Sequence, residues 1–390
     1  MAEDILFDLL NVPPLRFPEF KGEWEKEELG NSCNVLMCKR IFANQTNKKG
    51  GIPFYKIGTI GSIPDCYISP NLFCDYQKKY SYPKKGEVLV TCAGTIGRCF
   101  QYDGIDSYFQ DSNIVWIDNP KKIVDNDFLF YLISAHDWNK LNTTTITRLY
   151  NDDIRKIILS FPKSKQEQTK ITSLFSAVNK RLSVQRKIIE DTKTLKKALL
   201  QKVFPREGEP LPSIRFKGFT EPWEQRKLGD ESEYIVAGGD IDKEKLLETG
   251  KYPVIANALT HDGVVGYYQN SFRVQGPALT ITGRGDVGHA QARKSNFTPI
   301  VRLLAIKTKH DVDYLENAIN KKSFVVESTG VPQLTVPKVQ ELELYFPKQF
   351  SEETKIGQLF SGLDSLITLH QRKADSIQQV KKFLLANMFC

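Results

Sequence analysis

The sequence predicts an α+β chain of duplicated form, in which two similar mixed α/β domains alternate with two long helices. Three observations predict this fold class. Residues 162–204 recur at residues 347–389, the motif that opens at Arg16 recurs at Arg215, and strand, turn and helix signals follow each opening in the same order. At 390 residues the chain is long enough for two or more domains that each bury a core.

The repeated stretches predict the two long helices. Most identities fall at an offset of 185 residues, and Gln185 matches Gln371 at an offset of 186, a slip that a helix tolerates better than a strand. Apolar residues recur at spacings of mostly three and four, and no internal proline interrupts them. In the first copy the stripe is Ile171, Leu174, Val178, Leu182, Ile188, Thr192, Leu195 and Leu199. In the second copy it is Ile356, Leu359, Leu363, Leu366, His370, Ile377, Val380 and Leu384.

A stripe this narrow needs a partner helix of similar length, and the other copy is the obvious partner. Roughly 40 residues at 1.5 Å each give a rod of about 60 Å, which suits a spacer. Two ordinary core helices would explain the same pattern.

Each domain opens with the same motif. Residues 16–30 contain Arg-Phe, Trp-Glu and Leu-Gly at spacings that return at residues 215–229. The elements expected next, in order, are a strand, glycine-containing turn and strand at 87–101 and 277–293, a β-rich run at 113–117 and 300–306, a helix at about 126–140 and 312–322, and a polar loop at 143–149 and 328–334. The second polar loop keeps its place and changes its side chains, as expected of domains that share a scaffold and read different things.

Segment boundaries follow from these repeats. We expect an N-terminal domain at residues 1–162, a first helical spacer at 163–204, a linker at 205–214, a C-terminal domain at 215–347 and a second helical spacer at 348–390. Proline and glycine in the linker stop the first helix.

Composition and charge narrow the classes of protein. The net charge is +8, and residues 163–203 alone hold 11 Lys or Arg against 3 Asp or Glu. This excess suits a polyanion such as DNA, although a solvated helix face explains it as well. No apolar run reaches the roughly 18 residues of a membrane span, and Glu3 and Asp4 stand where a signal peptide would be basic, so we expect no membrane and a cytoplasmic location. The seven cysteines form no Cys-x-x-Cys pair, which favours free and mostly buried thiols.

Motifs for catalysis or cofactor binding are missing. Residues 283–288 fit Gly-x-Gly-x-x-Gly, but a dinucleotide-binding fingerprint opens a helix, whereas this run continues into a β-rich stretch. The sequence has no Walker A loop, no Gly-x-Ser-x-Gly and no His-Glu-x-x-His. After Asn119-Pro120 it has two lysines in place of the Pro-aromatic pair of an amino-methyltransferase. We therefore predict no catalytic, cofactor-binding or metal-binding residues, and no enzyme activity.

The order of domain, long helix, domain and long helix, with openings of the form Arg-Phe-x-x-Phe-x-x-x-Trp-Glu and helix ends such as Gln-Arg-Lys and Lys-Lys-x-Leu-Leu, resembles the specificity subunit of type I restriction-modification enzymes. The resemblance runs from about Arg16 to Phe389. It implies two target recognition domains held apart by an antiparallel coiled coil of the two helices, with pseudo-two-fold symmetry, and a bipartite asymmetric DNA site of which each domain reads one half.

The resemblance also implies the partners. Such a subunit is not catalytic. It binds double-stranded DNA and two modification subunits, which supply S-adenosylmethionine and methyl transfer, while restriction subunits add ATP- and Mg-dependent translocation and cleavage. The helices would fix the spacing and dock the modification subunits.

Candidate DNA-binding residues lie in turns and polar loops at equivalent places in both halves, because Arg, Lys, Asn, Gln and Thr read base edges and glycine lets the backbone approach phosphate. In the first domain the candidates are Lys56, Gly94, Thr95, Arg98, Thr147 and Arg148. In the second domain they are Asn257, Thr282, Arg284, Arg293 and Gln333. For any one of them a solvated loop residue or an ordinary turn glycine is the alternative.

Two other functions stay open on the sequence alone. One is a DNA-binding or scaffold protein of the same duplicated form that acts alone. The other is a self-contained nuclease or methyltransferase with a disguised site, which activity of the purified chain with magnesium or S-adenosylmethionine would reveal. The recognised bases and the gap between them cannot be read from the sequence.

Overall fold

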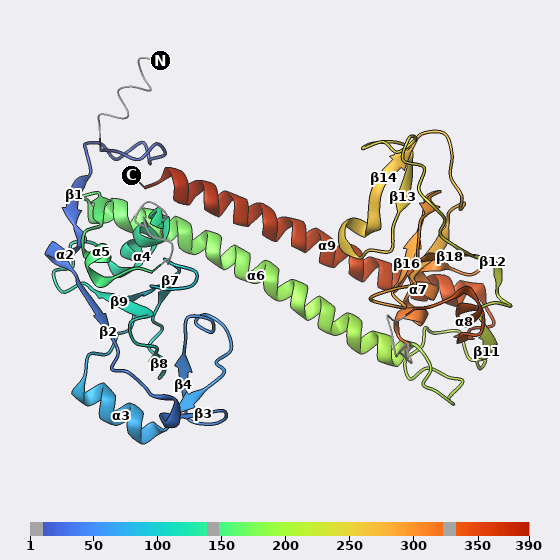
Figure 1. Ribbon diagram of the computed structural model, residues 1–390, viewed down its shortest axis with the longest axis horizontal. Coiled ribbons are helices and arrows are strands. Elements are labelled where there is room, and N and C mark those ends of the chain that lie inside the picture. The colour runs from blue at the N-terminus through green and yellow to red at the C-terminus, as the bar shows by residue number, and fades with distance from the viewer. Residues whose placement is uncertain (1–10, 139–147, 323–332, 390) are drawn as a thin grey trace, which may run out of the picture. The chain divides into compact units, whose positions relative to one another are not determined.

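The computed structural model describes residues 11–138, 148–322 and 333–389 (Figure 1). The chain forms two compact units. Unit 1 comprises Met1–Ser183 and Ala374–Cys390, and unit 2 comprises Val184–Lys373. Each unit therefore holds one mixed α/β domain together with a part of both long helices.

The core of unit 1 is a four-stranded sheet of order β2-β9-β6-β7. Its strands are β2 (Asn34–Met37), β9 (Ile114–Asp118), β6 (Val88–Thr91) and β7 (Cys99–Gln101). The central strands are buried apolar runs rich in β-branched residues, as strands covered on both faces usually are. Helix α4 (Asn126–Ala135) contacts β6 and β7 and adds Phe128 and Leu132 to the same core.

Smaller elements complete unit 1. A second sheet of order β3-β5-β4-β8 pairs β3 (Thr46–Asn47), β5 (Tyr67–Ile68), β4 (Ile52–Tyr55) and β8 (Tyr108–Phe109). A two-stranded ribbon pairs β1 (Glu25–Glu28) with β10 (Ile158–Phe161). The short helices are α2 (Leu29–Ser32), η1 (Ala43–Gln45), α3 (Pro70–Lys79) and α5 (Asn151–Arg155).

Unit 2 repeats this plan (Figure 1). Its four-stranded sheet of order β12-β18-β15-β16 contains β12 (Ser232–Ala237), β18 (Leu303–Thr308), β15 (Ala278–Thr282) and β16 (Ala290–Arg293). The second sheet contains β14 (Val264–Tyr268), β13 (Tyr252–Ile255) and β17 (Thr298–Pro299), and the ribbon pairs β11 (Glu224–Lys227) with β19 (Glu343–Phe346). The helices are η3 (Thr260–Gly263), α7 (Val312–Asn320) and α8 (Val336–Gln340). The shared strand order confirms the predicted duplication.

The long helices are α6 (Lys165–Val203) and α9 (Phe350–Asn387). In unit 1, Phe175 near the start of α6 lies against Phe389 just after α9, with ring centroids 5.8 Å apart. In unit 2, Phe204 just after α6 lies against Phe360 near the start of α9 at 5.9 Å. Since the start of each helix meets the end of the other, the helices pair antiparallel, which confirms the predicted pairing.

The apolar stripe is only partly the buried seam that the sequence predicts. Leu195, Leu366 and Val380, all placed in the stripe, are exposed, while Ile189 and Ala374 are buried. An α-helix of 3.6 residues per turn drifts by about 20° per heptad against a strict seven-residue repeat, so a stripe counted from one end turns out of the interface. Polar groups share the seam, since His370 Nδ1 lies 2.6 Å from Gln185 Oε1 in unit 2.

The repeated opening motif is explained by a buried ion pair in each unit. Arg16 donates from Nε to Glu167 Oε1 at 2.7 Å and from Nη2 to Glu167 Oε2 at 2.9 Å. Arg215 donates to both carboxylate oxygens of Glu352 at 2.6 and 2.8 Å. Both glutamates lie in the first turn of a long helix. The arginine of each opening therefore fastens its domain to the helix that follows the domain.

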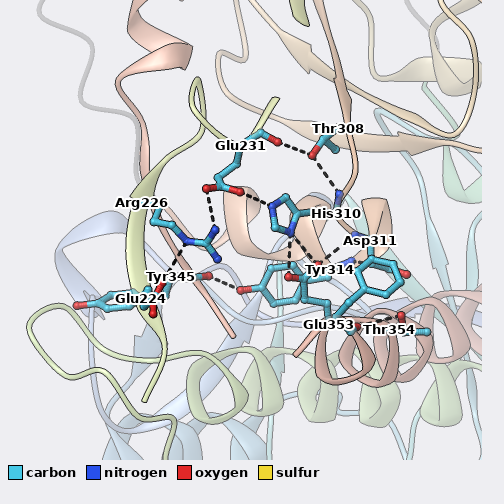
Figure 2. A network of polar contacts seen from close by, with 11 residues as sticks. Glu224, Arg226, Glu231, Thr308, His310, Asp311, Tyr314, Tyr345, Glu353 and Thr354 are labelled. Carbon is cyan, nitrogen blue, oxygen red and sulfur yellow. Dashed lines mark hydrogen bonds and ion pairs between the residues drawn. The ribbon is translucent and has the colours of Figure 1, made fainter. Parts of the chain in front are cut away.

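Unit 2 also contains a buried ionic network (Figure 2). His310 Nε2 lies 2.7 Å from Glu231 Oε2, and His310 Nδ1 lies 2.9 Å from Glu353 Oε1. Arg226 donates from Nη1 to Glu231 Oε1 at 2.7 Å. Burial alone would lower the pKa of His310, but its hydrogen bonds to the two carboxylates outweigh burial and raise that pKa above its ordinary value of 6.5.

The cysteines of the described ranges are free, and Cys33, Cys38, Cys66 and Cys92 are buried, which confirms the prediction of mostly buried thiols. Burial raises the pKa of the Cys33, Cys38 and Cys92 thiols to about 12. Among the described residues, no helix combines the length and the apolar character needed to cross a membrane.

Candidate nucleic-acid interface

In unit 1 the turn between β6 and β7 is tied together by one buried threonine. The Thr91 hydroxyl donates to the Thr95 carbonyl oxygen at 2.6 Å and accepts from the Arg98 backbone N–H at 3.0 Å. Gly94 and Gly97 have φ of +66° and +75°, a left-handed conformation that favours glycine. The turn is thereby fixed with the side chains of Thr95 and Arg98 exposed.

Unit 2 builds the same turn between β15 and β16. The Thr282 hydroxyl donates to the Asp286 carbonyl oxygen and accepts from the His289 backbone N–H at 2.9 Å. Gly288 N–H donates to the Thr282 carbonyl at 2.9 Å, as Gly97 does to Thr91 at 2.8 Å in unit 1. The Gly-x-Gly-x-x-Gly run is therefore a hairpin turn, which agrees with the rejection of a dinucleotide site.

A second segment lies beside each turn. Arg148 forms an isolated β-bridge with Ala93 in unit 1, and Gln333 forms the same bridge with Arg284 in unit 2. Adjacent hydrogen bonds, Leu149 N–H to the Cys92 carbonyl at 2.8 Å and Leu334 N–H to the Gly283 carbonyl at 2.9 Å, hold each segment in place. The structure thus brings together the glycine turn and the end of the polar loop, which are more than 45 residues apart in each half.

The other candidates of unit 1 lie around this turn. Lys56 donates from Nζ to Asp65 at 3.0 Å, and this hydrogen bond raises the lysine pKa. The Arg98 guanidinium lies over the Phe100 ring at 5.1 Å. Arg148 donates from Nη2 to the Ser112 carbonyl at 3.2 Å and lies 6.0 Å from the Tyr150 ring centroid. Thr147 lies outside the described residues.

The candidates of unit 2 divide into internal and exposed groups. The Asn257 amide accepts from Gly283 N–H at 2.6 Å and donates to the Arg284 carbonyl at 2.7 Å, while Thr282 is only 5% exposed. Arg293 donates from Nε to Thr280 Oγ1 at 3.0 Å, and burial lowers its pKa. The side chains of Arg284 and Gln333 are exposed at the surface of the turn.

Sequence reasoning missed one pair in unit 1. Arg40 donates from Nε to Asp111 Oδ2 at 2.8 Å, and Asp111 precedes Ser112, whose carbonyl accepts from Arg148. The partners are 71 positions apart, so no local motif connects them. The only local signal was the turn-forming run Asp111-Ser112-Asn113.

The site has a surface character. Its exposed groups are guanidinium, ammonium, hydroxyl and amide groups around backbone turns, which suit hydrogen bonding to base edges and phosphates. In the part of the chain that the structure describes, no three or more His, Cys, Asp and Glu side chains gather so that they could hold a metal ion. The fold and these paired surfaces define a two-domain recognition protein.

Comparison with known proteins gives the family. The model of the type I restriction-modification DNA specificity domain matches residues 21–193 and again residues 220–379, well over half of the chain. This chain therefore belongs to the type I restriction-modification DNA specificity family. As such it is the specificity component, which is the non-catalytic one, of a type I system.

Relatives and solved structures agree with this assignment. A type I restriction enzyme specificity subunit of Haemophilus influenzae is 53% identical over 147 residues, but the match spans only 38% of this chain and 38% of that relative. A type I specificity subunit of Mycoplasma pneumoniae is 26% identical over 309 residues, which cover 77% of this chain and 78% of the relative. The crystal structure of a type I restriction-modification S subunit from M. genitalium has the same fold, with a TM-score of 0.67 at 16% identity, covering 97% of this chain and 99% of that one.

Proposed function

We propose that this chain is the DNA recognition subunit of a type I restriction-modification complex and that each of its two domains reads one half of a bipartite, asymmetric site. The observation that carries the proposal is the pair of equivalent surfaces. Each has the same glycine turn and the same bridge to a second segment, with Arg148 in one unit and Gln333 in the other. Identical scaffolds with different side chains suit two different half-sites.

Within each surface we propose two kinds of role. Thr282 and Asn257, whose polar atoms bind the turn itself, shape the turn and do not reach bases. The exposed Thr95, Arg98, Arg284 and Gln333, together with Arg148, Lys56, Arg293 and Thr147, contact DNA, and Gly94 lets the backbone approach phosphate. Direct readout by arginine favours guanine, and readout by glutamine favours adenine.

The helices are assigned two tasks. Their pairing holds the recognition domains at a set separation, so the segments at 1–162, 163–204, 205–214, 215–347 and 348–390 act as domain, spacer, linker, domain and spacer. Their outer faces dock two modification subunits. This docking is supported by large apolar side chains that are exposed on the helices, namely Val184, Leu195, Leu366, Leu369, Val380 and Phe383.

The remaining partners follow from the family. Modification subunits would carry S-adenosylmethionine, and restriction subunits would carry ATP and Mg, so this chain needs no cofactor of its own. A solved structure titled for complex assembly and conformational transition of the type I system has a TM-score of 0.55 with this chain at 15% identity, covering 95% of this chain and 98% of that one. Work on cellular DNA places the chain in the cytoplasm.

The test is to co-express the chain with its modification subunit and to map methylated adenines in the host DNA. We expect a split motif. Replacing Arg148 with Ala should relax only one half of the motif, and replacing Gln333 with Ala should relax only the other half, by about 1–3 kcal/mol of discrimination each. Loss of binding to all sequences alike would mark either residue as a phosphate contact. A stable complex without methylation would favour a scaffold, and methylation or cleavage by the purified chain alone would favour a self-contained enzyme.

A further inference from the structure

We propose that Arg40, held by Asp111, reads a guanine in the half-site of the first domain. The inference rests on the proposed function and adds to it a residue and a base. The Arg40 side chain is 60% exposed, and the Asp111 side chain that accepts from its Nε at 2.8 Å is 16% exposed. A guanidinium bound through Nε keeps its two Nη nitrogens as a fork, the arrangement that donates to guanine O6 and N7 in the major groove.

The backbone around Arg40 is fixed before any DNA arrives. The hydroxyl of the fully buried Tyr108 donates to the Lys39 carbonyl at 3.0 Å, and Ile41 is buried on the other side of Arg40. Arg40 is thus anchored on both sides and by its own ion pair. A side chain held in this way loses little conformational entropy on binding, which favours discrimination between bases.

The turn that carries Asp111 is joined to the recognition surface. Asn113 N–H donates to the Asp111 carbonyl at 2.6 Å, and the Asn113 carbonyl accepts from Cys92 N–H at 2.8 Å at the start of the glycine turn. Ser112 has φ of +54°, which is uncommon for a residue other than glycine and is found preferentially at functional sites. Its carbonyl accepts from Arg148 Nη2, so Arg40 and Arg148 flank one turn.

The surface between them is a pocket with the chemistry of base recognition. Its polar lining consists of Arg40, Thr46, Lys56, Gln110, Asp111 and Asn113. Lys56 is one of the residues that the sequence already predicts to bind DNA. Two cations, a hydroxyl and two amides suit a DNA base edge, whereas the carboxylate of Asp111 would disfavour a phosphate placed directly upon it.

Unit 2 lacks the pair at the equivalent positions. Pairing of Met37 with Val115 in unit 1 and of Ala237 with Leu304 in unit 2 places Asp240 where unit 1 has Arg40. The turn that follows β17 runs Ile300-Val301-Arg302 and contains no acidic residue. The Arg40 and Asp111 pair therefore belongs to the first domain alone, as a determinant of one half-site should.

The experiment uses the complex of the full chain with its modification subunit and compares Arg40→Lys, Arg40→Ala and Asp111→Asn by methylome mapping. We expect each variant to lose preference for guanine at one position of the first half-site while the second half-site is unchanged. Arg155→Ala is the matched control, because Arg155 donates to Asp152 at 2.8 Å in an exposed pair on the same domain. The control should leave the motif as it is.

A second measurement uses the wild-type complex and so does not depend on how a variant folds. Replacing the assigned guanine by 7-deazaguanine removes the N7 acceptor and should weaken binding roughly 10-fold, within the range of one bidentate contact. The same replacement should have no further effect on the Arg40→Lys complex. An unchanged motif in Arg40→Ala, or equal weakening on every sequence, would overturn the assignment. A wild-type complex with no split motif would instead refute the proposed function.

Discussion

Gly97 shows how closely a single residue is specified by its surroundings. Its φ is +75°, and a Cβ at this position would overlap the indole ring of Trp138. We expect Gly97→Ala to destabilise the first domain by about 2–4 kcal/mol, because strain in the turn adds to overpacking. Urea unfolding would measure the loss.

The matched control for Gly97 is Gly285→Ala in the second domain. Gly285 has φ of +77°, but a Cβ added there would have no heavy atom within 4 Å. It should cost only the conformational term of about 1 kcal/mol. Equal losses for the two variants would show that the contact with Trp138 does not restrict position 97.

His310 should make the second domain respond to pH. The raised pKa of His310 means that its stabilisation is complete below about pH 6.5 and is lost as the pH rises through the folded value. Burial would raise the pKa of Glu231, but His310 and Arg226 outweigh burial and lower it below 4.5, so its stabilisation is present above that pH and is lost on acidification. The network therefore contributes most between about pH 4.5 and 6.5.

Replacing His310 with Gln should lower the free energy of unfolding by about 1–3 kcal/mol near pH 6 and by less above pH 8, since a charge-assisted hydrogen bond is lost only where the histidine is charged. Hydrogen exchange of the α7 amides over this pH range is the measurement. The first domain offers a design for the control, because Val124 and Gln168 stand where the second has His310 and Glu353. The double variant with Val and Gln at 310 and 353 should show a flatter pH profile, and a loss independent of pH in His310→Gln would contradict the assignment.

At this scale the sequence predicts the place of the site better than the task of each side chain. Turn glycines and polar loops were visible because their signals are local. Thr282 and Asn257 look alike to solvated readers in the sequence, and only the hydrogen bonds they make to the turn distinguish them. Arg40 was missed because its partner Asp111 is far away in the sequence and is brought near by strand pairing.

At the scale of elements, the ion pair between each opening motif and a long helix governs how a domain is attached. Glu352 is 1% exposed and accepts from two nitrogens of Arg215. Removing one partner of a buried pair leaves the other charge unpaired, so Glu352→Ala should cost about 3–5 kcal/mol. The double variant with Arg215→Ala should cost much less than the sum of the single variants, as urea unfolding in a double-mutant cycle would show.

The first unit provides the comparison. There Glu167 also accepts from Trp24 Nε1 at 3.2 Å, whereas the buried Trp223 Nε1 has no hydrogen-bond partner among the described residues. Glu167→Ala should therefore cost more than Glu352→Ala, because it leaves two donors unpaired. Additive losses in both cycles would mean that the pairs do not couple the opening to the helix.

Prediction succeeded for elements with a strong period and failed where tertiary packing decides. The strands near Val88 and Ala278 and the helices at α4 and α7 lie where the pattern placed them. Helix α3 (Pro70–Lys79) was not predicted, since its only deeply buried residue is Phe73 and its apolar signal is weak. The long helices were correct in extent, but the residues of their seam shifted because 3.6 does not divide seven.

At the scale of the whole molecule, duplication is the feature from which the rest of the plan follows. Each unit repeats one strand order, one ion pair and one turn with its bridged neighbour, while the side chains on the turn differ. A chain built in this way can change one half of its specificity without disturbing the other. Duplication was readable from the sequence alone because repeated residues need no structural knowledge to be matched.

The spacer role predicts how the gap between half-sites changes with helix length. Gln185 of α6 and His370 of α9 touch at the middle of the pair, and Lys187 and Lys373 lie close to that contact in sequence. Inserting seven residues after both lysines adds about 10 Å to each helix and preserves its heptad register. Since base pairs stack at about 3.4 Å, the methylated motif should keep both halves and lengthen its gap by roughly two to three base pairs. Inserting seven residues into α6 alone should instead break the pairing and lower stability, because α9 can no longer match it. An unchanged gap in the double insertion, measured by methylome mapping, would show that the helices do not set the spacing.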